Sequence, residues 1–220
     1  MVAIVSALHP AALPEISKML EHAARVRYAS RQVIVRAGET PTSLYFILAG
    51  SVTVLTEDRD GEEFILSYLG PGEFFGELGF FDATLARSAS VRARSKCEVA
   101  AIGYDRFRSL IEQTPALLMQ LATQVAYRLR DASANLGSLA FLDVKGRIAR
   151  ILLDLAHDSE AITHPDGMLV RVSREELGRL VNCSREMASR VLVDLQQQGL
   201  IAVEGKSIVI RDPQATRRSP

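Results

Sequence analysis

The chain has 220 residues, 48% of them hydrophobic, and its 26 basic and 26 acidic residues give a formal net charge of zero. This length and composition predict one large or two modest domains and exclude a wholly disordered chain. The charge balance alone gives no evidence for nucleic-acid binding. The two cysteines, Cys97 and Cys183, lie in no metal-ligand spacing, so we expect buried small side chains rather than a zinc site or a disulfide.

The sequence contains no candidate membrane anchor. No apolar run approaches the ~20 residues that a membrane-spanning helix needs. Residues 1–16 lack a basic start followed by a long apolar run, so they do not resemble a signal peptide. We therefore expect a soluble, cytoplasmic protein that does not bind a membrane.

Residues 16–24 predict a short helix, and the region from Tyr28 to about Phe107 has the pattern of a β domain. Asp60-Gly61, between two β-rich runs, is a typical hairpin turn. Such runs, separated by glycine turns, cover 33–35, 44–50, 51–57, 63–70, 88–94 and 97–103. Many short strands with regular turns predict a sandwich, barrel or roll.

After Tyr104 the hydrophobic period becomes helical. Apolar residues recur at spacings of three and four at Leu118, Leu121, Val125, Leu129, Ala132, Leu136 and Leu139. Such a long helix needs something to cover its apolar stripe. A partner helix in a parallel dimer is the favoured explanation, and packing back onto the β domain is the alternative.

The C-terminal part predicts a helix, a strand and a final hairpin around a helix pair. Asp143 can cap a helix whose apolar face includes Val144, Ile148, Ile151, Leu152 and Leu155. Residues 163–167 predict a turn, 168–172 a short strand, and 200–210 a hairpin.

The segment from Ser173 to Gly199 predicts a helix-turn-helix. Ser173 and Glu176 form a capping box that begins one helix, which Asn182-Cys183 ends. Ser184 can cap the second helix, and Gly199 can end it. With the hairpin that follows, the arrangement is that of a winged helix-turn-helix.

The second helix of this pair divides into two faces. Its apolar face contains Ala188, Val191, Leu192 and Leu195. Its polar face contains Arg185, Glu186, Ser189 and Arg190 near the end that enters the major groove in this motif. Arginine suits guanine O6 and N7, and glutamate can accept from cytosine N4. An ordinary solvated face is the alternative.

A second functional pattern lies between Gly70 and Val91. Glycines let backbone N–H groups approach an anion, and Gly76 stands beside Glu77 and Leu78. Arg87 offers a permanent charge to a phosphate, and Ser88 offers a hydroxyl. Because Glu77 suits a sugar hydroxyl rather than a phosphate, the set fits a sugar phosphate with a free 2′-OH. A glycine-rich corner with a surface arginine is the alternative.

From about Tyr28 to Ile210 the sequence resembles the cyclic AMP receptor protein (catabolite activator) family of bacterial regulators, almost without gaps. The resemblance rests on LYFILAGSVTVL, EEFILSYLGPGEFFGELG, ARSASVRAR, CEVAAIGYDRF, LAFLDVKGRIA, ITHPDGM and CSREMASRVL. It implies an α+β fold: a jelly-roll-like cyclic-nucleotide-binding β-roll in residues 1–115, a dimerisation helix and hinge in 116–141, and a winged helix-turn-helix in 142–220.

The resemblance also implies roles for single residues. Gly76, Glu77, Arg87 and Ser88, with Leu78 in the same block, match the family's phosphate and ribose contacts. Arg128 matches a further pocket position, and Ser133 matches a serine that reaches the base from the partner subunit. The DNA-binding set is Arg174, Ser184, Arg185, Glu186 and Arg190, of which Arg185, Glu186 and Arg190 match base-reading residues and imply a TGTGA-like palindrome.

Some positions depart from the family pattern. Ala132 replaces a threonine that helps to read adenine, so cyclic GMP, cyclic di-GMP or no effector at all are alternatives to the favoured cyclic AMP. Val193 replaces a lysine of the recognition helix. The loop 163–165 resembles an RNA polymerase contact, but Ala24 and Val26 replace histidines of a second one.

The expected function is therefore an allosteric, homodimeric transcription regulator. The effector would favour one arrangement of the helix pair, and the hinge at 141–143 would pass this on to the DNA-binding heads. A nucleotide-binding module that regulates an enzyme is a distant alternative. We expect no enzyme, because His9, His22, His157 and His164 share no catalytic motif.

Overall fold

A computed structural model describes residues 14–82, 84–158 and 160–211, and for residues 134, 135 and 137–141 it describes only the backbone. The chain divides into two compact units, Met1–Ala132 and Ser133–Pro220. The helix α4 (Ala116–Phe141) begins in the first unit and ends in the second. Each unit is described by itself.

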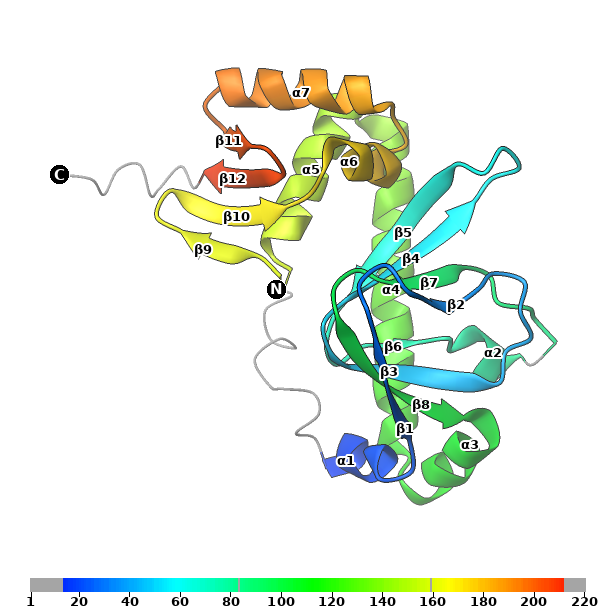
Figure 1. Cartoon of the computed structure of the whole chain (residues 1–220). Helices are drawn as coiled ribbons and strands as arrows, with labels where there is room; N and C mark the ends of the chain where they lie inside the picture. Colours follow the sequence, from blue (N-terminus) through cyan, green and yellow to red (C-terminus); the bar gives the residue numbers. More distant parts are fainter. Residues whose placement is uncertain (1–13, 83, 159, 212–220) are drawn as a thin grey trace. The chain divides into compact units, whose positions relative to one another are not determined.

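The first unit is built on two antiparallel sheets of four strands each (Figure 1). Their strand orders are β1-β8-β3-β6 and β2-β7-β4-β5. The strands are β1 (Ala24–Tyr28), β2 (Val33–Val35), β3 (Ser43–Ala49), β4 (Val52–Glu57), β5 (Glu63–Leu69), β6 (Phe74–Phe75), β7 (Ser90–Ala93) and β8 (Cys97–Gly103). The predicted β domain, with its hairpin turn at Asp60-Gly61, is confirmed.

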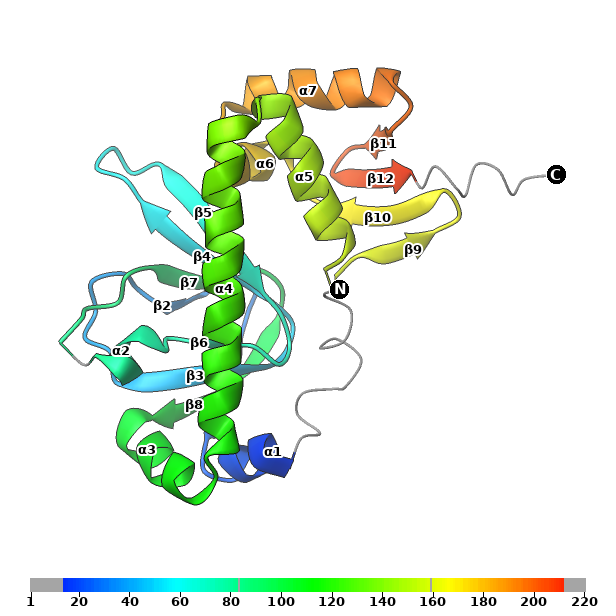
Figure 2. The same ribbon diagram turned by 180° about the vertical axis from the view of Figure 1, so that it is seen from behind.

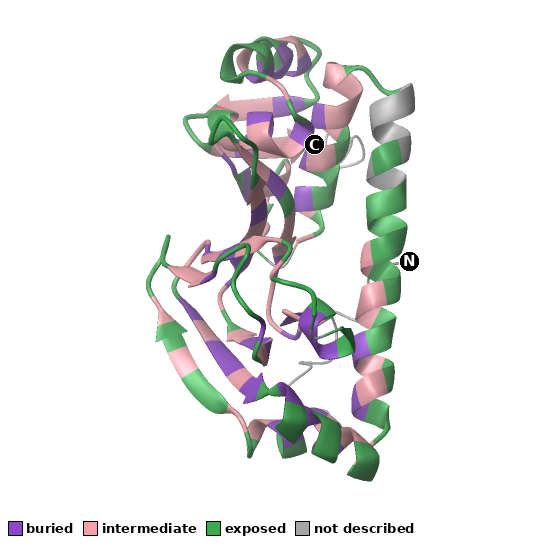
Figure 3. Ribbon diagram, turned by 90° about the vertical axis from the view of Figure 1, so that its right-hand side faces the viewer, coloured by how far each residue is buried: buried purple, intermediate pink, exposed green. Residues whose placement is uncertain are grey.

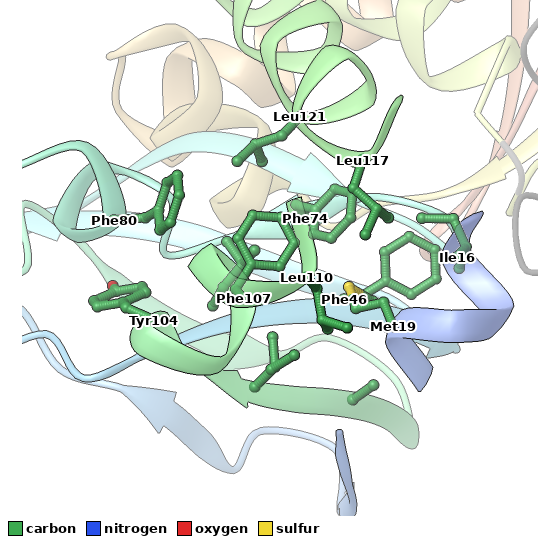
Figure 4. Packing of buried hydrophobic residues seen from close by; sticks show 13 residues of the cluster. Ile16, Met19, Phe46, Phe74, Phe80, Tyr104, Phe107, Leu110, Leu117 and Leu121 are labelled. Atoms are coloured by element: carbon green, nitrogen blue, oxygen red, sulfur yellow. The ribbon is translucent and has the colours of Figure 1, made fainter. Parts of the chain in front are cut away.

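Two hydrophobic clusters hold this unit together. One lies between the sheets and includes Ile47, Val52, Phe75, Val91 and Val99. The other packs helices against the first sheet: α1 (Pro14–Leu20), α2 (Leu78–Phe81), α3 (Tyr104–Gln113) and the start of α4. Figure 4 shows its large side chains, which are Ile16, Met19, Phe46, Phe74, Phe80, Tyr104, Phe107, Leu110, Leu117 and Leu121. This second cluster fixes α4 against the strand that precedes Gly76.

The long helix α4 is seen along its whole length in Figure 2, and its fully buried side chains lie in its first two turns. Leu117 and Leu121 are fully buried, whereas Leu129 and Leu136 are 69% and 68% exposed. Figure 3 shows this change from buried and partly buried residues to exposed ones along the helix. The predicted long helix is confirmed. The early members of its apolar stripe pack onto the β domain, and its later described members are exposed. The side chain of Leu139 lies outside the described residues.

In its described residues, the second unit combines the end of α4 and three further helices with a four-stranded sheet of order β11-β12-β10-β9. Its elements are α5 (Val144–Ala156), β9 (Ile162–His164), β10 (Gly167–Arg171), α6 (Arg174–Val181), α7 (Arg185–Gln197), β11 (Ile201–Glu204) and β12 (Ser207–Arg211). Asp143 caps α5 by accepting from the N–H of Gly146 at 2.7 Å, as predicted. The buried face of α5 includes Ile148 and Leu152.

Several local predictions need correction. Of the turn predicted for 163–167, residues 163 and 164 belong to β9 and Gly167 begins β10, because the turn needs only Pro165 and Asp166. The first helix ends at Leu20, and β1 begins at Ala24. Cys97 is buried as expected, but Cys183 is only partly buried. No helix in the described part of the chain is long and apolar enough to span a membrane.

Candidate functional site

The guanidinium of Arg87 lies in a frame of three acceptors, two main-chain carbonyl groups and one phenol hydroxyl. Nη2 donates to the carbonyl oxygen of Ser43 at 2.7 Å, and Nη1 donates to that of Gly76 at 3.0 Å and to the hydroxyl of Tyr104 at 3.0 Å. These bonds use three of the five donors that a guanidinium carries. The two other donors remain for an anion, and every acceptor in the frame is uncharged, so the site keeps its positive charge.

Gly76 and Tyr104 complete the frame. Gly76 has a φ of +81°, and a β-carbon there would lie 2.4 Å from Nη1 of Arg87. The hydroxyl of Tyr104 donates to the carbonyl oxygen of Gly76 at 2.7 Å. Burial raises the pKa of Tyr104 against the opposing effect of Arg87, so the phenol stays a neutral donor. Only glycine therefore fits at position 76 without moving the arginine.

Glu77 faces a second arginine, which α4 supplies. Nη1 of Arg128 lies 3.2 Å from Oε1 of Glu77, whose side chain is 14% exposed. Arg128 also lies 3.7 Å from Glu73 and donates to the carbonyl oxygen of Phe74. Its Nε is buried and has no hydrogen-bond partner among the described residues. The ion pair places the carboxylate of Glu77 beside Gly76, where it can accept from a sugar hydroxyl.

The predicted ligand residues do not all join this cluster. Gly76, Glu77, Arg87 and Arg128 are brought together by the contacts above. Ser88 is exposed beside Arg87, and Leu78 is 48% exposed at the start of α2. Ser133 is an exposed residue of α4 in the second unit. Gly76, Glu77, Leu78, Arg87, Ser88 and Arg128 are called the candidate ligand site below.

The second unit contains the predicted helix pair with its caps. Both halves of the capping box are present at Ser173 and Glu176, and Ser184 accepts from the N–H of Met187. Between the helices Asn182 takes a left-handed conformation with φ of 54°. A β-carbon at Gly178 would lie 2.6 Å from the carbonyl oxygen of Cys183, so the tight turn requires glycine there.

The outer face of α7 carries the residues predicted to read DNA. Arg185, Glu186 and Arg190 are exposed, whereas its apolar face is buried, comprising Ala188, Val191, Leu192 and Leu195. Ser184 is exposed at the beginning of the helix. Arg174 is only half-exposed, and it donates to the carbonyl oxygen of Gly205 in the β11–β12 turn at 3.1 Å. The helix thus presents a polar, arginine-containing face beside a β-hairpin wing.

Comparison with known proteins places both units. The family model of the cyclic nucleotide-binding domain matches residues 25–114, and that of the Crp-like helix-turn-helix domain matches residues 146–218. The cAMP-activated global transcriptional regulator Vfr of Pseudomonas aeruginosa is 49% identical over 210 residues, which are 94% of this chain and 98% of Vfr. The chain belongs to the cyclic AMP receptor protein (Crp) family. The expected fold class is confirmed.

Two further Crp-family proteins show how effectors differ. The cAMP-activated regulator CRP of Salmonella typhimurium is 48% identical over 90% of this chain and 94% of its own length. The solved structure of the c-di-GMP responsive regulator CLP of Xanthomonas campestris is 42% identical, with a TM-score of 0.83 over 90% of this chain and 98% of that one. These relatives are transcription regulators, in line with the expected absence of enzyme activity.

Sequence reasoning missed three residues that support the candidate ligand site. They are Ser43, Tyr104 and Gln124, which act through a main-chain oxygen, a phenol and a carboxamide. Ser43 contributes a group that every residue has, so no pattern could reveal it. Tyr104 and Gln124 lie 28 and 52 positions from the glycines whose carbonyl oxygens they contact, and only the fold brings them there.

Proposed function

We propose that this Crp-family protein binds a cyclic nucleotide at the candidate ligand site and that the nucleotide-bound protein binds a specific DNA sequence. The observation that carries the proposal is the joint occurrence in one chain of two sites. One is the Arg87 frame beside the Glu77–Arg128 ion pair, which suits a sugar phosphate. The other is the exposed arginine face of α7.

A gel-shift assay with a palindromic TGTGA-like site tests this function. Cyclic AMP should increase the fraction of bound DNA, and Arg87→Leu should abolish that increase because it removes the phosphate-facing charge. Arg59→Leu, an exposed arginine in the β4–β5 turn, is the matched control and should respond like the unchanged protein. An equal response of the Arg87 variant would reject the site.

Cyclic AMP is the favoured effector because the relatives Vfr and CRP are cAMP-activated and this chain has the residues proposed to bind the phosphate. The c-di-GMP responsive relative and the exposed Ala132 support the alternative of another nucleotide. Calorimetry with cyclic AMP, cyclic GMP and cyclic di-GMP tests these alternatives, because the effector should be the nucleotide that binds most tightly. Constant DNA affinity with all three would support a regulator that needs no effector.

Base reading by α7 is proposed for Arg185, Glu186 and Arg190, with Ser184 and Arg174 contacting the DNA nearby. Removing a side chain that binds one base pair costs ~1–3 kcal/mol and relaxes specificity at that position. Arg190→Ala should therefore weaken binding to the TGTGA-like site but change binding to random DNA little, in a titration of both duplexes. An equal loss on both would mark Arg190 as a phosphate contact.

We further propose a homodimer that acts in the cytoplasm and contacts RNA polymerase through residues 163–165, at the end of β9 and the start of the turn that follows. Six residues of α4 recur at alternating spacings of three and four, and all are exposed: Met119, Ala122, Ala126, Leu129, Ser133 and Leu136. This is the heptad pattern of a two-stranded coiled coil. Ser133 lies in the same row, which agrees with a role at the partner's ligand site.

The proposed switch links the nucleotide to the helix pair. Binding favours one arrangement of the two α4 helices, and the break at 142–143, between the end of α4 and α5, passes it to the DNA-binding units. A ligand shifts such an equilibrium only by its differential affinity, typically ~1–3 kcal/mol. The two recognition helices must then lie about 34–36 Å apart to enter successive major grooves.

A further inference from the structure

The carboxamide of Gln124 makes two hydrogen bonds to the main chain of the first sheet. Its Oε1 accepts from the N–H of Phe74 at 2.9 Å, and its Nε2 donates to the carbonyl oxygen of Gly72 at 2.8 Å. Gly72 and Phe74 are buried, while Gln124 itself is partly buried. An acceptor and a donor two residues apart are the two groups that a neighbouring strand would satisfy.

No strand covers this edge of the sheet among the described residues, because β6 is the last strand and pairs only with β3. On the β3 side, the carbonyl oxygen of Glu73 accepts from Ile47 at 3.0 Å. The N–H of Gly72 also faces β3 and donates to the carbonyl oxygen of Ile47 at 2.8 Å, whereas the carbonyl oxygen of Gly72 and the N–H of Phe74 face α4. Gln124 thus replaces a strand at this edge, where unpaired buried groups would be costly.

Arg128 continues the same contact one helical turn further on. It donates to the carbonyl oxygen of Phe74 and pairs with Glu77, two residues past the end of β6. Residues four apart on a helix lie on one face, so Gln124 and Arg128 form a single row of contacts. This row holds three main-chain groups in a fixed position along α4, shortly before Gly76: the carbonyl oxygen of Gly72 and the N–H and carbonyl oxygen of Phe74.

We propose that Gln124 is a positioning residue that sets the segment 72–77 against α4, so that occupation of the candidate ligand site and movement of α4 are linked. The proposal rests on the proposed function, since it assumes that the site binds a cyclic nucleotide. The hydrogen bonds of Gln124 go to the main chain of Gly72 and Phe74. It acts through the backbone that carries Gly76 and Glu77.

Three variants test the role, with cyclic AMP as the probe in calorimetry at several pH values. Gln124→Leu loses both bonds and should bind roughly tenfold more weakly. Gln124→Glu keeps an acceptor for Phe74, but its carboxylate repels the carbonyl oxygen of Gly72. Once protonated, that carboxyl can donate to Gly72. Its affinity relative to the unchanged protein should therefore recover as the pH falls toward ~5.

Gln120→Glu is the matched control, because it introduces the same charge one turn earlier on α4. It should show neither the loss of affinity nor the recovery at low pH. A merely structural loss would instead lower the affinity of the two Gln124 variants alike at every pH. That result, or an unchanged affinity of Gln124→Leu, would overturn the positioning role.

Amide hydrogen exchange separates this proposal from the proposed function. In protein without nucleotide, the Phe74 amide should exchange faster in Gln124→Leu than in the unchanged chain, because its acceptor is gone. Equal exchange rates would overturn the contact itself. Failure of the unchanged protein to bind any cyclic nucleotide would reject the proposed function, and the ligand role of Gln124 with it, while the exchange result still reports the contact.

Discussion

Gly76 shows how a single hydrogen atom in place of a side chain permits the arrangement of the candidate ligand site. Its β-carbon position lies 2.4 Å from Nη1 of Arg87 and 3.2 Å from the carbonyl oxygen of Ser43. The guanidinium and its acceptors occupy the space that any other residue would need. Gly61 has the same φ of +81° in the β4–β5 turn, but nothing lies within 4 Å of its β-carbon position.

These two glycines give a matched pair of substitutions. Both Gly76→Ala and Gly61→Ala carry the cost of a left-handed alanine, ~1–3 kcal/mol of stability. Only Gly76→Ala should also displace Arg87 and weaken nucleotide binding, by roughly tenfold or more for a lost charge-assisted hydrogen bond. Thermal unfolding and calorimetry together check both effects. Equal nucleotide affinity in the two variants would contradict the proposed role of Gly76.

At the scale of elements, a tight approach defines the turn between α6 and α7. Gly178→Ala would raise helix propensity by about 1 kcal/mol, but its β-carbon would meet the main-chain oxygen of Cys183 at 2.6 Å. We expect a net loss of ~1–3 kcal/mol in the second unit, as for other forced contacts in a packed site. Urea unfolding measures it. Gly146→Ala in α5 is the comparison. Apart from the backbone of its own helix, the new β-carbon would approach only side-chain atoms, at 3.3–3.4 Å, so this substitution should be neutral or stabilising.

The elements that sequence patterns predicted are those with strong local signals. The strands around Asp60-Gly61 and the caps at Ser173 and Ser184 follow from turn and capping chemistry within a few residues. The strand β6 has only two residues and α2 only four, too few for any hydrophobic period to appear. In β1 the sequence ARVRY alternates as in a half-buried strand, but its five residues follow directly on the predicted helix 16–24, and the strand was missed.

The candidate ligand site could be predicted as a set of residues but not as a geometry. Gly76, Glu77 and Arg87 lie in one stretch of sequence with recognisable chemistry. Their partners Tyr104 and Arg128 come from α3 and α4, and nothing in local spacing places a phenol or a second guanidinium beside them. Which part of the apolar stripe along α4 packs onto the β domain could not be predicted for a related reason. Spacings of three and four fit two neighbouring rows of a helix equally well.

An ion pair between α5 and α7 makes the stability of the second unit depend on pH. Nζ of Lys145 lies 2.5 Å from Oδ2 of Asp194, and this contact, with a smaller contribution from Gln198, lowers the pKa of Asp194. A folded-state pKa below the unfolded one stabilises the fold above the unfolded value of ~3.9. That contribution is lost as the pH falls through the lowered pKa.

Asp194→Asn should therefore be slightly less stable than the unchanged protein at pH 7, and the difference should shrink as the pH drops below ~4. The effect is small because both side chains are substantially exposed. Urea unfolding across this pH range measures it. Lys145→Met should reproduce the loss at pH 7. A difference that stays constant with pH would show that the charge of Asp194 does not contribute.

At the scale of the whole molecule, a single chain leaves the apolar row on α4 uncovered. Leu129 and Leu136 stand seven residues apart, and Met119 is 65% exposed in the same row. Alanines at 122 and 126 would allow close approach of a second helix. Burying a leucine side chain contributes ~1.5–3 kcal/mol, so a symmetric pair of helices would gain each contribution twice.

Leu129→Asp should convert the proposed dimer into a monomer, because it would bring two carboxylates together at the centre of the helix pair. Sedimentation at micromolar concentration measures the change in mass. DNA affinity for the palindrome should fall with it, since one chain can hold only one half-site. Leu153→Asp, a 53% exposed leucine of α5 outside the row, is the control and should remain dimeric. If the Leu129 variant is still a dimer with unchanged affinity for the palindrome, the dimer interface does not include this row of α4. Ser133 would then lose its proposed role.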